Sequence, residues 1–344
     1  MNSHSSSTAR GADQAHAASQ THAADETHAA NEREPPPAWG RLPQIGVVRF
    51  AGPDAASFLQ GQVSNDTRHL AEGAPLLAAY SSAQGRVIAV VHLLPHSSGI
   101  LALLPREVVA ATQERLRKFV LRAKVKIEDL SDQFVVAGMD ASALSAAGIG
   151  VPGSSGYLES NGVAVACVRR YAASASERYW LVGDAASVAD AAPIGPIGST
   201  ASAAAASTAI ERNWRLADIR EGLPQIYAAT SELFVAQMLN LDLIGGISFE
   251  KGCYTGQEII ARTQNLGRIK RRLSRLRLPS GPWSIGGQLR LGDGRTGRLT
   301  EVAPVGTGFE ALAVLSLEAG PGDPEIASGE AVSAEELSLP YRTA

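Results

Sequence analysis

Cysteine is scarce in this sequence, which has only Cys167 and Cys253 among its 344 residues. Two thiols allow one disulfide at most. They cannot form a four-cysteine metal site, and they cannot hold an iron–sulfur cluster without ligands from elsewhere. Such sparing use of cysteine is typical of the reducing cytosol. We therefore expect a cytoplasmic protein with no metal site of its own.

Long apolar runs are also missing. No stretch approaches the roughly 18 to 20 apolar residues of a bilayer-spanning helix, so an integral membrane protein is not expected. The first 40 residues have neither the apolar core of a secretory signal nor the arginine-rich pattern of an organelle signal. The motifs G-x-x-x-x-G-K-S/T, C-x-x-C and H-E-x-x-H are absent. A dinucleotide-type match at 292–297 has no helix after it and fits a hairpin turn, so we discard it.

The net charge of −3 comes entirely from the first 40 residues, which hold two arginines and five acidic residues. This segment is rich in Ser, Ala, His and Thr and ends in three prolines, Pro35 to Pro37. Its apolar content is too low to offset the entropy of ordering, so a disordered tail is predicted over 1–40. Four of the seven histidines lie there, so a weak metal-binding tail is an alternative to a passive solubilising one.

The body of the chain mixes hairpin and helix patterns. Apolar runs at 76–80 and 86–94 flank a Gly-containing turn and predict a β-hairpin. Helical spacing extends over 107–121. This mixture indicates α+β architecture rather than a regular βαβ repeat. Further strands are predicted over 45–50, 101–104, 125–127 and 134–137, and further helices over 54–60 and 207–221.

Two features suggest how the body is divided. Ala, Ser, Gly and Pro dominate 184–208, where we expect a poorly packed connection. From about residue 279 onward, short strand patterns are broken by Gly and Pro, which predicts an all-β domain, a barrel, over 279–344. The α+β body then covers 41–278.

The most distinctive segment is 251–258, KGCYTGQE, which lies between a strand pattern and a helical run. Thr255 and Glu258 have the spacing of a capping box, with Thr255 as the predicted N-cap. Cys253 would then lie near the positive end of the helix and close to Lys251, and both influences favour the thiolate. Cys253 and Lys251 are therefore the catalytic candidates. The alternative is a buried cysteine in a tight turn, and for Cys167, inside an apolar run, we expect a core position.

Positive charge follows this loop. Residues 259–292 contain no acidic residue and eight basic ones. Leu273 and Leu276 would lie on different faces of the strand predicted there, so its arginines need not all share one face. An anion site for a polyglutamate tail, phosphate or RNA is one interpretation, and a solvated strand is the other. The eight are Arg262, Arg268, Lys270, Arg271, Arg272, Arg275, Arg277 and Arg290.

The helix before Gly222 carries a third candidate group. Trp214, Asp218 and Glu221 are spaced to share one helical face. An indole beside carboxylates can hold a flat heterocycle that bears an N–C–NH2 edge. A core stripe with Glu221 in solvent is the alternative.

Taken together, these motifs resemble the YgfZ family, the folate-binding branch of the glycine-cleavage T-protein (aminomethyltransferase) superfamily. The signature is 251–258 with GGISF before it and Ala261-Arg262 after it. Supporting matches are FLQGQVSND at 58–66, Gly85-Arg86, REGLP at 220–224, and Gly267. The resemblance spans roughly 45 to 344 and implies a three-domain cloverleaf of two interleaved α+β domains and a C-terminal β-barrel.

The resemblance also implies a function. A monomeric accessory protein would bind tetrahydrofolate or a one-carbon derivative and would help to assemble, maintain or repair [4Fe–4S] proteins. Its partners would be iron–sulfur proteins and their assembly machinery, including a tRNA-modifying enzyme. The loop cysteine would be required. Trp214 and Glu221 would hold the pterin, and Tyr254, Gln257 and Arg262 would complete the folate site, with Arg262 and the basic strand at the glutamate tail.

Two departures from the family pattern limit this implication. A second folate-associated tryptophan of the family corresponds to Ile45 here. The catalytic Asp of T-proteins would fall near 106–109, where this sequence has none, which speaks against glycine-cleavage chemistry. A folate-dependent one-carbon transferase and a tRNA-binding module based on the basic block are the alternative functions.

Overall fold

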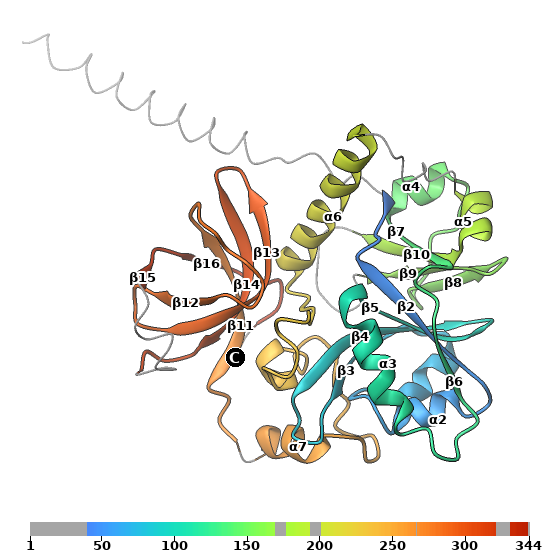
Figure 1. Cartoon of the computed structure of the whole chain (residues 1–344), viewed down its shortest axis with the longest axis horizontal. Helices are drawn as coiled ribbons and strands as arrows, with labels where there is room; N and C mark the ends of the chain where they lie inside the picture. The colour runs from blue at the N-terminus through green and yellow to red at the C-terminus, as the bar shows by residue number, and fades with distance from the viewer. Residues whose placement is uncertain (1–39, 169–176, 193–200, 266, 321–330, 343–344) are drawn as a thin grey trace, which may run out of the picture. The chain divides into compact units, whose positions relative to one another are not determined.

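The computed structural model describes residues 40–168, 177–192, 201–265, 267–320 and 331–342, and for 201–206 the backbone alone (Figure 1). The chain divides into a segment Met1–Ala38 and a compact unit Trp39–Ala344. The predicted disordered tail lies outside the described residues except for Gly40.

A five-stranded antiparallel sheet in the order β3-β4-β5-β2-β6 forms the first layer. The predicted hairpin is confirmed, because β3 and β4 pair from Leu76↔Leu93 to Ser81↔Val87. One face of the sheet is covered by two α-helices and two 3-10 helices, which bury an apolar cluster around Phe50, Phe58 and Leu116. The elements are β2 (Ile45–Ala51), α2 (Ala55–Gln60), η1 (Thr67–Glu72), β3 (Leu76–Ser81), β4 (Val87–His96), β5 (Gly99–Pro105), η2 (Arg106–Val108), α3 (Val109–Arg117) and β6 (Lys126–Asp129).

A second five-stranded sheet has the order β1-β7-β10-β9-β8. The chain enters this sheet at Gly40, leaves it for the first sheet, and returns at Phe134, so the two α+β layers are interleaved as expected. Its elements are β1 (Gly40–Arg41), β7 (Phe134–Asp140), α4 (Ala141–Ala146), β8 (Tyr157–Ser160), β9 (Val163–Cys167), β10 (Arg178–Asp184) and α5 (Ala185–Ala191).

The C-terminal layer is a curled six-stranded sheet in the order β15-β12-β13-β14-β11-β16. It begins at Arg271 rather than at the expected residue 279, because β11 pairs with β14 along its whole length. Leu273 and Leu276 on β11 face different apolar clusters, as their spacing predicted. The strands are β11 (Arg271–Leu278), β12 (Gln288–Leu291), β13 (Thr296–Val305), β14 (Gly308–Ser316), β15 (Ala331–Val332) and β16 (Glu335–Leu337).

The long helix α6 (Ala201–Glu221) joins the three layers (Figure 1). It contacts β1 of the second sheet and β13 and β14 of the third. One buried cluster unites Leu94 of β4, Trp180 of β10, Trp214 of α6 and Leu312 of β14. The remaining helices, η4 (Ala236–Leu239) and α7 (Gln257–Asn265), lie in the connection to the third sheet.

Two predicted segments differ from the structure. The helix expected over 107–121 ends at Arg117, because the chain turns there and packs Val120 against the first core. The poorly packed connection expected over 184–208 contains α5 and the start of α6. Asp184 accepts hydrogen bonds from the N–H groups of Ala186 and Ser187 and so begins α5 in an alanine-rich run. Residues 193–200 lie outside the described part.

In the parts that the structure describes, no helix has the length and apolar content needed to cross a bilayer.

Candidate functional site

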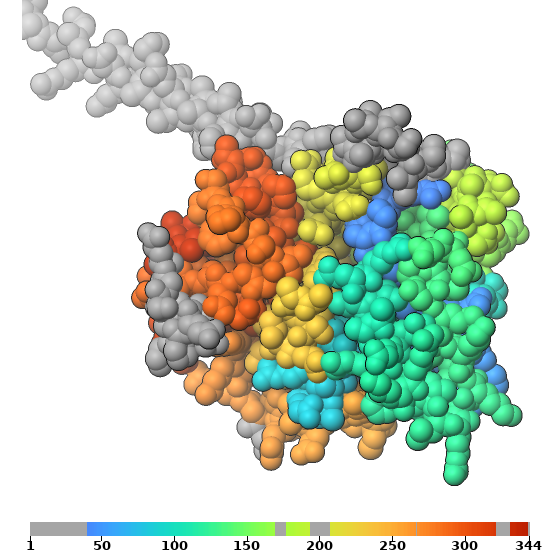
Figure 2. All heavy atoms as spheres, viewed as in Figure 1, coloured from blue at the N-terminus to red at the C-terminus, as the bar shows by residue number. Residues whose placement is uncertain are grey.

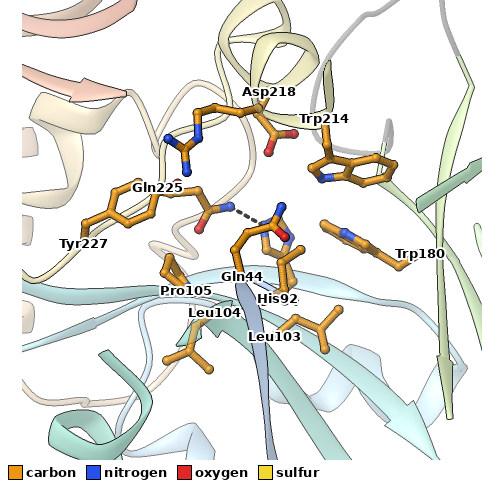
Figure 3. Close-up of a pocket in the computed structure, with 12 residues that line it drawn as sticks. Gln44, His92, Leu103, Leu104, Pro105, Trp180, Trp214, Asp218, Gln225 and Tyr227 are labelled. Atoms are coloured by element: carbon orange, nitrogen blue, oxygen red, sulfur yellow. Dashed lines mark hydrogen bonds between the residues drawn. The ribbon is translucent and has the colours of Figure 1, made fainter. Parts of the chain in front are cut away.

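A cavity opens where α6 meets the two α+β sheets (Figure 3). It holds about 470 Å³ of empty space, its open mouth included. Open solvent at the mouth makes up part of this volume, so it is an upper limit on the space inside the wall. Side chains from β2, β4, β5, β10, α6 and the segment after α6 form its wall: Gln44, Ile45, His92, Leu103, Leu104, Pro105, Trp180, Trp214, Arg215, Asp218, Gln225 and Tyr227.

Four of the twelve wall residues have aromatic rings. The Trp180 and Trp214 rings lie 6.4 Å apart at 43°, and His92 packs edge-on to Trp180 at 4.5 Å. Trp214 can lie against β7 only because residue 138 is glycine: a Cβ there would be 2.2 Å from the indole Cζ3. Tyr227 closes the opposite side (Figure 3). The cavity therefore offers flat faces to a planar ligand.

Polar groups in the same wall lack protein partners. Among the described residues, no hydrogen bond is made by the indole N–H of Trp180 or Trp214, or by the side-chain carbonyl oxygen of Gln44 or Gln225. Buried donors and acceptors without partners are costly in a protein interior. Both kinds of group line a space that a heterocycle with donors and acceptors can fill.

Below the indole of Trp214 lies a buried charge cluster. Arg178 of β10 is 2% exposed, and its guanidinium carbon is 4.6 Å from the centre of the Trp214 ring. It donates to both Glu221 oxygens, at 2.9 and 2.7 Å, and to Asp218 Oδ1 at 2.8 Å. The two carboxylates share one helical face, as predicted. Glu221, however, is occupied by Arg178 and does not line the cavity, whereas Asp218 does.

Burial changes the proton affinity of the carboxyls near the cavity. Desolvation raises the pKa of Asp218 to about 6 against the opposing charge of Arg178. Desolvation also raises the pKa of Glu301 on β13 to about 7. Glu301 accepts a hydrogen bond from Tyr227 at 2.7 Å and lies 3.2 Å from Nε of Arg215. The C-terminal sheet thus holds two residues of the cavity wall in place.

Lys251 is buried among backbone carbonyl groups. It is 5% exposed, and its ammonium donates to the carbonyl oxygens of Gln60 at 2.8 Å and of Val63 and Asn65 at 2.7 Å. Burial lowers the pKa of Lys251 to about 8. Its three N–H donors are all used, and its Nζ lies 4.9 Å from the centre of the Tyr254 ring. Lys251 therefore fastens the loop to the segment after α2.

Cys253 is an exposed free thiol. The predicted cap of the following helix is wrong: α7 begins at Gln257, and Gly256 takes a left-handed φ of +83° before it. A Cβ at position 256 would lie 2.6 Å from the carbonyl oxygen of Ser82, so the backbone packs closely there and the chain turns tightly before the helix starts. Cys253 consequently lies farther from the helix N-terminus than the capping box implied.

The thiol loop and the cavity are separate. None of residues 251–258, all of which are described, lines the cavity. The loop lies past the outer edge of β3, because Lys251 binds Val63 and Val63 bridges to Tyr80 of β3. The cavity wall begins at β4, with His92. About two strand spacings, roughly 10 Å, lie between them.

The other residues predicted to bind folate also lie outside the cavity wall. Tyr254 is buried in the central apolar cluster, while Gln257 and the exposed Arg262 lie on α7. None of these three residues contributes to the cavity wall. Of the residues predicted to bind the pterin, Trp214 alone lines the cavity, and Ile45 lies in the same wall.

Half of the eight basic residues of the positive block have acidic partners. Arg272 is buried and pairs with Asp242, Arg275 pairs with Glu310, and Arg268 and Arg277 form exposed pairs. Within the described ranges, four members have no ionic partner: Arg262, Lys270, Arg271 and Arg290. The block is therefore not the continuous anion site that its composition suggested.

Several wall residues escaped the sequence interpretation. Trp180 and Arg178 alternate along β10, so both face α6. The sequence feature that could have identified them is a buried strand pattern that contains an arginine and one of the four tryptophans of the chain. Gln44 and Gln225 had no such signal, because only the packing of three layers brings them to one cavity.

The fold is that of a glycine-cleavage T-protein. Aminomethyltransferase T of the glycine cleavage system from Bartonella henselae has a TM-score of 0.53 and 13% identity, with 81% of this chain and 78% of that chain covered. No family model matches the sequence.

Sequence comparison identifies the family. The chain is 34% identical over 235 residues to tRNA-modifying protein YgfZ of Colwellia psychrerythraea (strain 34H), covering 67% of this chain and 69% of the relative. It is 34% identical over 263 residues to tRNA-modifying protein YgfZ of Edwardsiella ictaluri (strain 93-146), covering 74% and 76%. The chain belongs to the YgfZ family, which confirms the resemblance based on residues 251–258.

Proposed function

We propose that this protein binds tetrahydrofolate or a one-carbon derivative in the central cavity and serves as an accessory protein for [4Fe–4S] proteins, linked to tRNA modification. The observation that carries the proposal is the cavity wall, in which aromatic faces surround polar atoms without protein partners. The T-protein fold and the name of the relatives, tRNA-modifying protein, support it.

The residues of the wall fit a pterin. Trp214 and Trp180 provide flat faces, and the carbonyl oxygens of Gln44 and Gln225 can accept from ring N–H and amino groups. Asp218 takes the role that we expected of Glu221, because Glu221 gives both oxygens to Arg178. When bound, a reduced folate would supply one-carbon or redox chemistry. The chain's own residues bind and orient it and exclude water.

The anionic end of the ligand needs a cation. Arg215 lies in the cavity wall, whereas Arg262 is on α7 and does not. In our proposal Arg215 attracts the ligand carboxylates, and its pairing with Glu301 sets its position. Arg262 then remains a candidate only for a long glutamate tail that leaves the cavity.

Cys253 acts elsewhere, at the surface. Its exposed thiol lies on a loop that contributes nothing to the cavity wall, so it is suited to a bulky substrate such as the cluster of another protein. One thiolate cannot complete the ligand set of a [4Fe–4S] cluster, so the remaining ligands come from the partner protein or small thiols. This separation favours an accessory role over direct transfer of a one-carbon group from folate to Cys253.

The decisive experiment is a tetrahydrofolate titration followed by tryptophan fluorescence. Quenching is expected in the parent protein and in Trp283→Phe, whose residue lies in the third layer, and it should be reduced in Trp214→Phe and Trp180→Phe. Asp218→Asn should weaken binding about tenfold or more, since it removes a charged hydrogen bond. Absence of quenching in the parent would refute the folate site. Unchanged cellular iron–sulfur enzyme activities in Cys253→Ala would refute the thiol role.

A one-carbon transferase is the second candidate, and Asp218 is the observation that favours it. A carboxyl with a pKa of about 6 inside the cavity can take or give a proton near neutral pH, although no Asp occurs at 106–109. Turnover of methylene- or formyl-tetrahydrofolate by the purified protein, lost in Asp218→Asn, would establish this function in place of the accessory role.

A further inference from the structure

The loop between α3 and β6 is the most basic surface segment that the function above does not use. Six basic residues and no acidic residue occur from Arg115 to Lys126. Three of them, Arg117, Arg122 and Lys124, are exposed and have no ionic partner among the described residues. Three acidic residues beside the loop are already engaged: Glu114 pairs with Lys118, Glu128 with Arg49 and Lys126, and Glu232 with Arg115.

Apolar side chains lie exposed among these charges. Phe119 is 47% exposed and Leu121 is 86% exposed. Inward-facing neighbours hold the loop, because Val120, Ala123 and Val125 pack against the core of the first sheet. The backbone N–H of Lys124 donates to the Asp54 carboxylate at 2.6 Å. Phe119 and Leu121 are thus presented by an anchored backbone rather than by a loose loop, and they have no apolar cover.

The loop shares one side of the molecule with the thiol. The backbone N–H of Lys124 donates to Asp54 at the start of α2, and the Lys251 ammonium donates to the carbonyl oxygen of Gln60 at its end. Helix α2 has six residues, so its ends are about 9 Å apart. Between them the exposed residues of α2 are the small Ala56 and Ser57. Figure 1 shows the α3–β6 connection passing α2, and Figure 2 shows this part of the chain at the surface of the molecule.

We propose that the α3–β6 loop is an RNA-docking surface that brings a folded RNA of the tRNA type beside Cys253. The unpaired cations match a phosphate backbone, and Phe119 can stack on an unpaired base while Leu121 covers its edge. The inference deepens the tRNA link of the proposed function and moves it away from the 259–292 block, half of whose basic residues already have acidic partners. It does not depend on the folate cavity, because no residue of 115–126 lines that wall.

The test measures binding of unmodified bulk tRNA to the full chain by fluorescence anisotropy between about 50 and 200 mM salt. The variant Arg117→Gln/Arg122→Gln/Lys124→Gln should raise the Kd about tenfold or more and lower the salt slope by about 2 to 3. The charge-matched control Arg262→Gln/Lys270→Gln/Arg271→Gln should bind tRNA like the parent. Phe119→Ser/Leu121→Ser should weaken binding with the salt slope unchanged.

Two further measurements separate this inference from its competitors. In a Cys167→Ser background, saturating tRNA should slow alkylation of Cys253 by a bulky maleimide. The triple loop variant should keep its tetrahydrofolate quenching, so loss of RNA binding is distinguished from loss of the folate site. No tRNA binding by the parent, equal weakening in the control variant, or binding to phosphatidylglycerol vesicles in place of tRNA would each overturn the proposal.

Discussion

The Arg178 guanidinium is bound to both carboxylate oxygens of Glu221, through Nε at 2.9 Å and through Nη2 at 2.7 Å. Both side chains are buried, at 2% and 3% exposure. This pair connects the second sheet to the end of α6, directly beneath Trp214. Glu221 therefore has a structural role in shaping the cavity, and Asp218 is the carboxyl that remains accessible from inside it.

Removal of Glu221 should cost much stability. In Glu221→Ala the Arg178 charge stays buried with only Asp218 to pair with, so we expect a loss of about 3 to 5 kcal/mol in the free energy of unfolding. Urea denaturation followed by circular dichroism measures this loss. Glu211→Ala, a change on the same helix outside the cluster, should cost far less. A stable Glu221→Ala protein with weak folate binding would instead mean that Glu221 contacts the ligand.

The sequence allowed the individual layers to be predicted more readily than the site. The hairpin of β3 and β4 and the helix that carries Trp214 follow from local apolar periodicity, which short segments retain. The cavity depends on the packing of three layers, and no local pattern reports that Arg178 reaches Glu221 over 43 residues. The capping box failed for a related reason: the contact of Gly256 with the β3–β4 turn sets the start of α7.

Lys251→Met should destabilise the protein rather than remove a catalytic proton. The change leaves the buried carbonyls of Gln60, Val63 and Asn65 without their donor, at a cost of about 3 kcal/mol. Lys251→Arg should not restore stability, because a planar guanidinium cannot donate to three carbonyls that surround one ammonium. The exposed Lys270→Met is the control. If Lys251→Met kept full stability but abolished cellular function, Lys251 would be a catalytic group.

Glu301 should make stability depend on pH. Its folded-state pKa of about 7 exceeds the ordinary 4.5, so the folded protein binds a proton there that the unfolded chain has released. The parent's free energy of unfolding should therefore fall, relative to Glu301→Gln, as the pH rises through this window, by roughly 3 kcal/mol in all. The groups that face Glu301 are Arg215, Tyr227 and Asp218, all present in both proteins. Parallel stability curves for the two proteins from pH 4.5 to 7 would contradict the expectation.

Gly138→Ala should disturb the cavity from behind Trp214. The new Cβ would lie 2.2 Å from the indole Cζ3, and the ring can yield only by moving toward Trp180 and the cavity. Overpacking of this kind costs about 1 to 3 kcal/mol. Because the indole face is displaced, tetrahydrofolate quenching should weaken even where the variant is fully folded. Gly153→Ala, which meets no atom within 4 Å, is the matched control and should keep both stability and quenching. Unchanged quenching in a folded Gly138→Ala protein would mean that the ligand does not depend on the position of Trp214, and the cavity would then lose its place as the folate site.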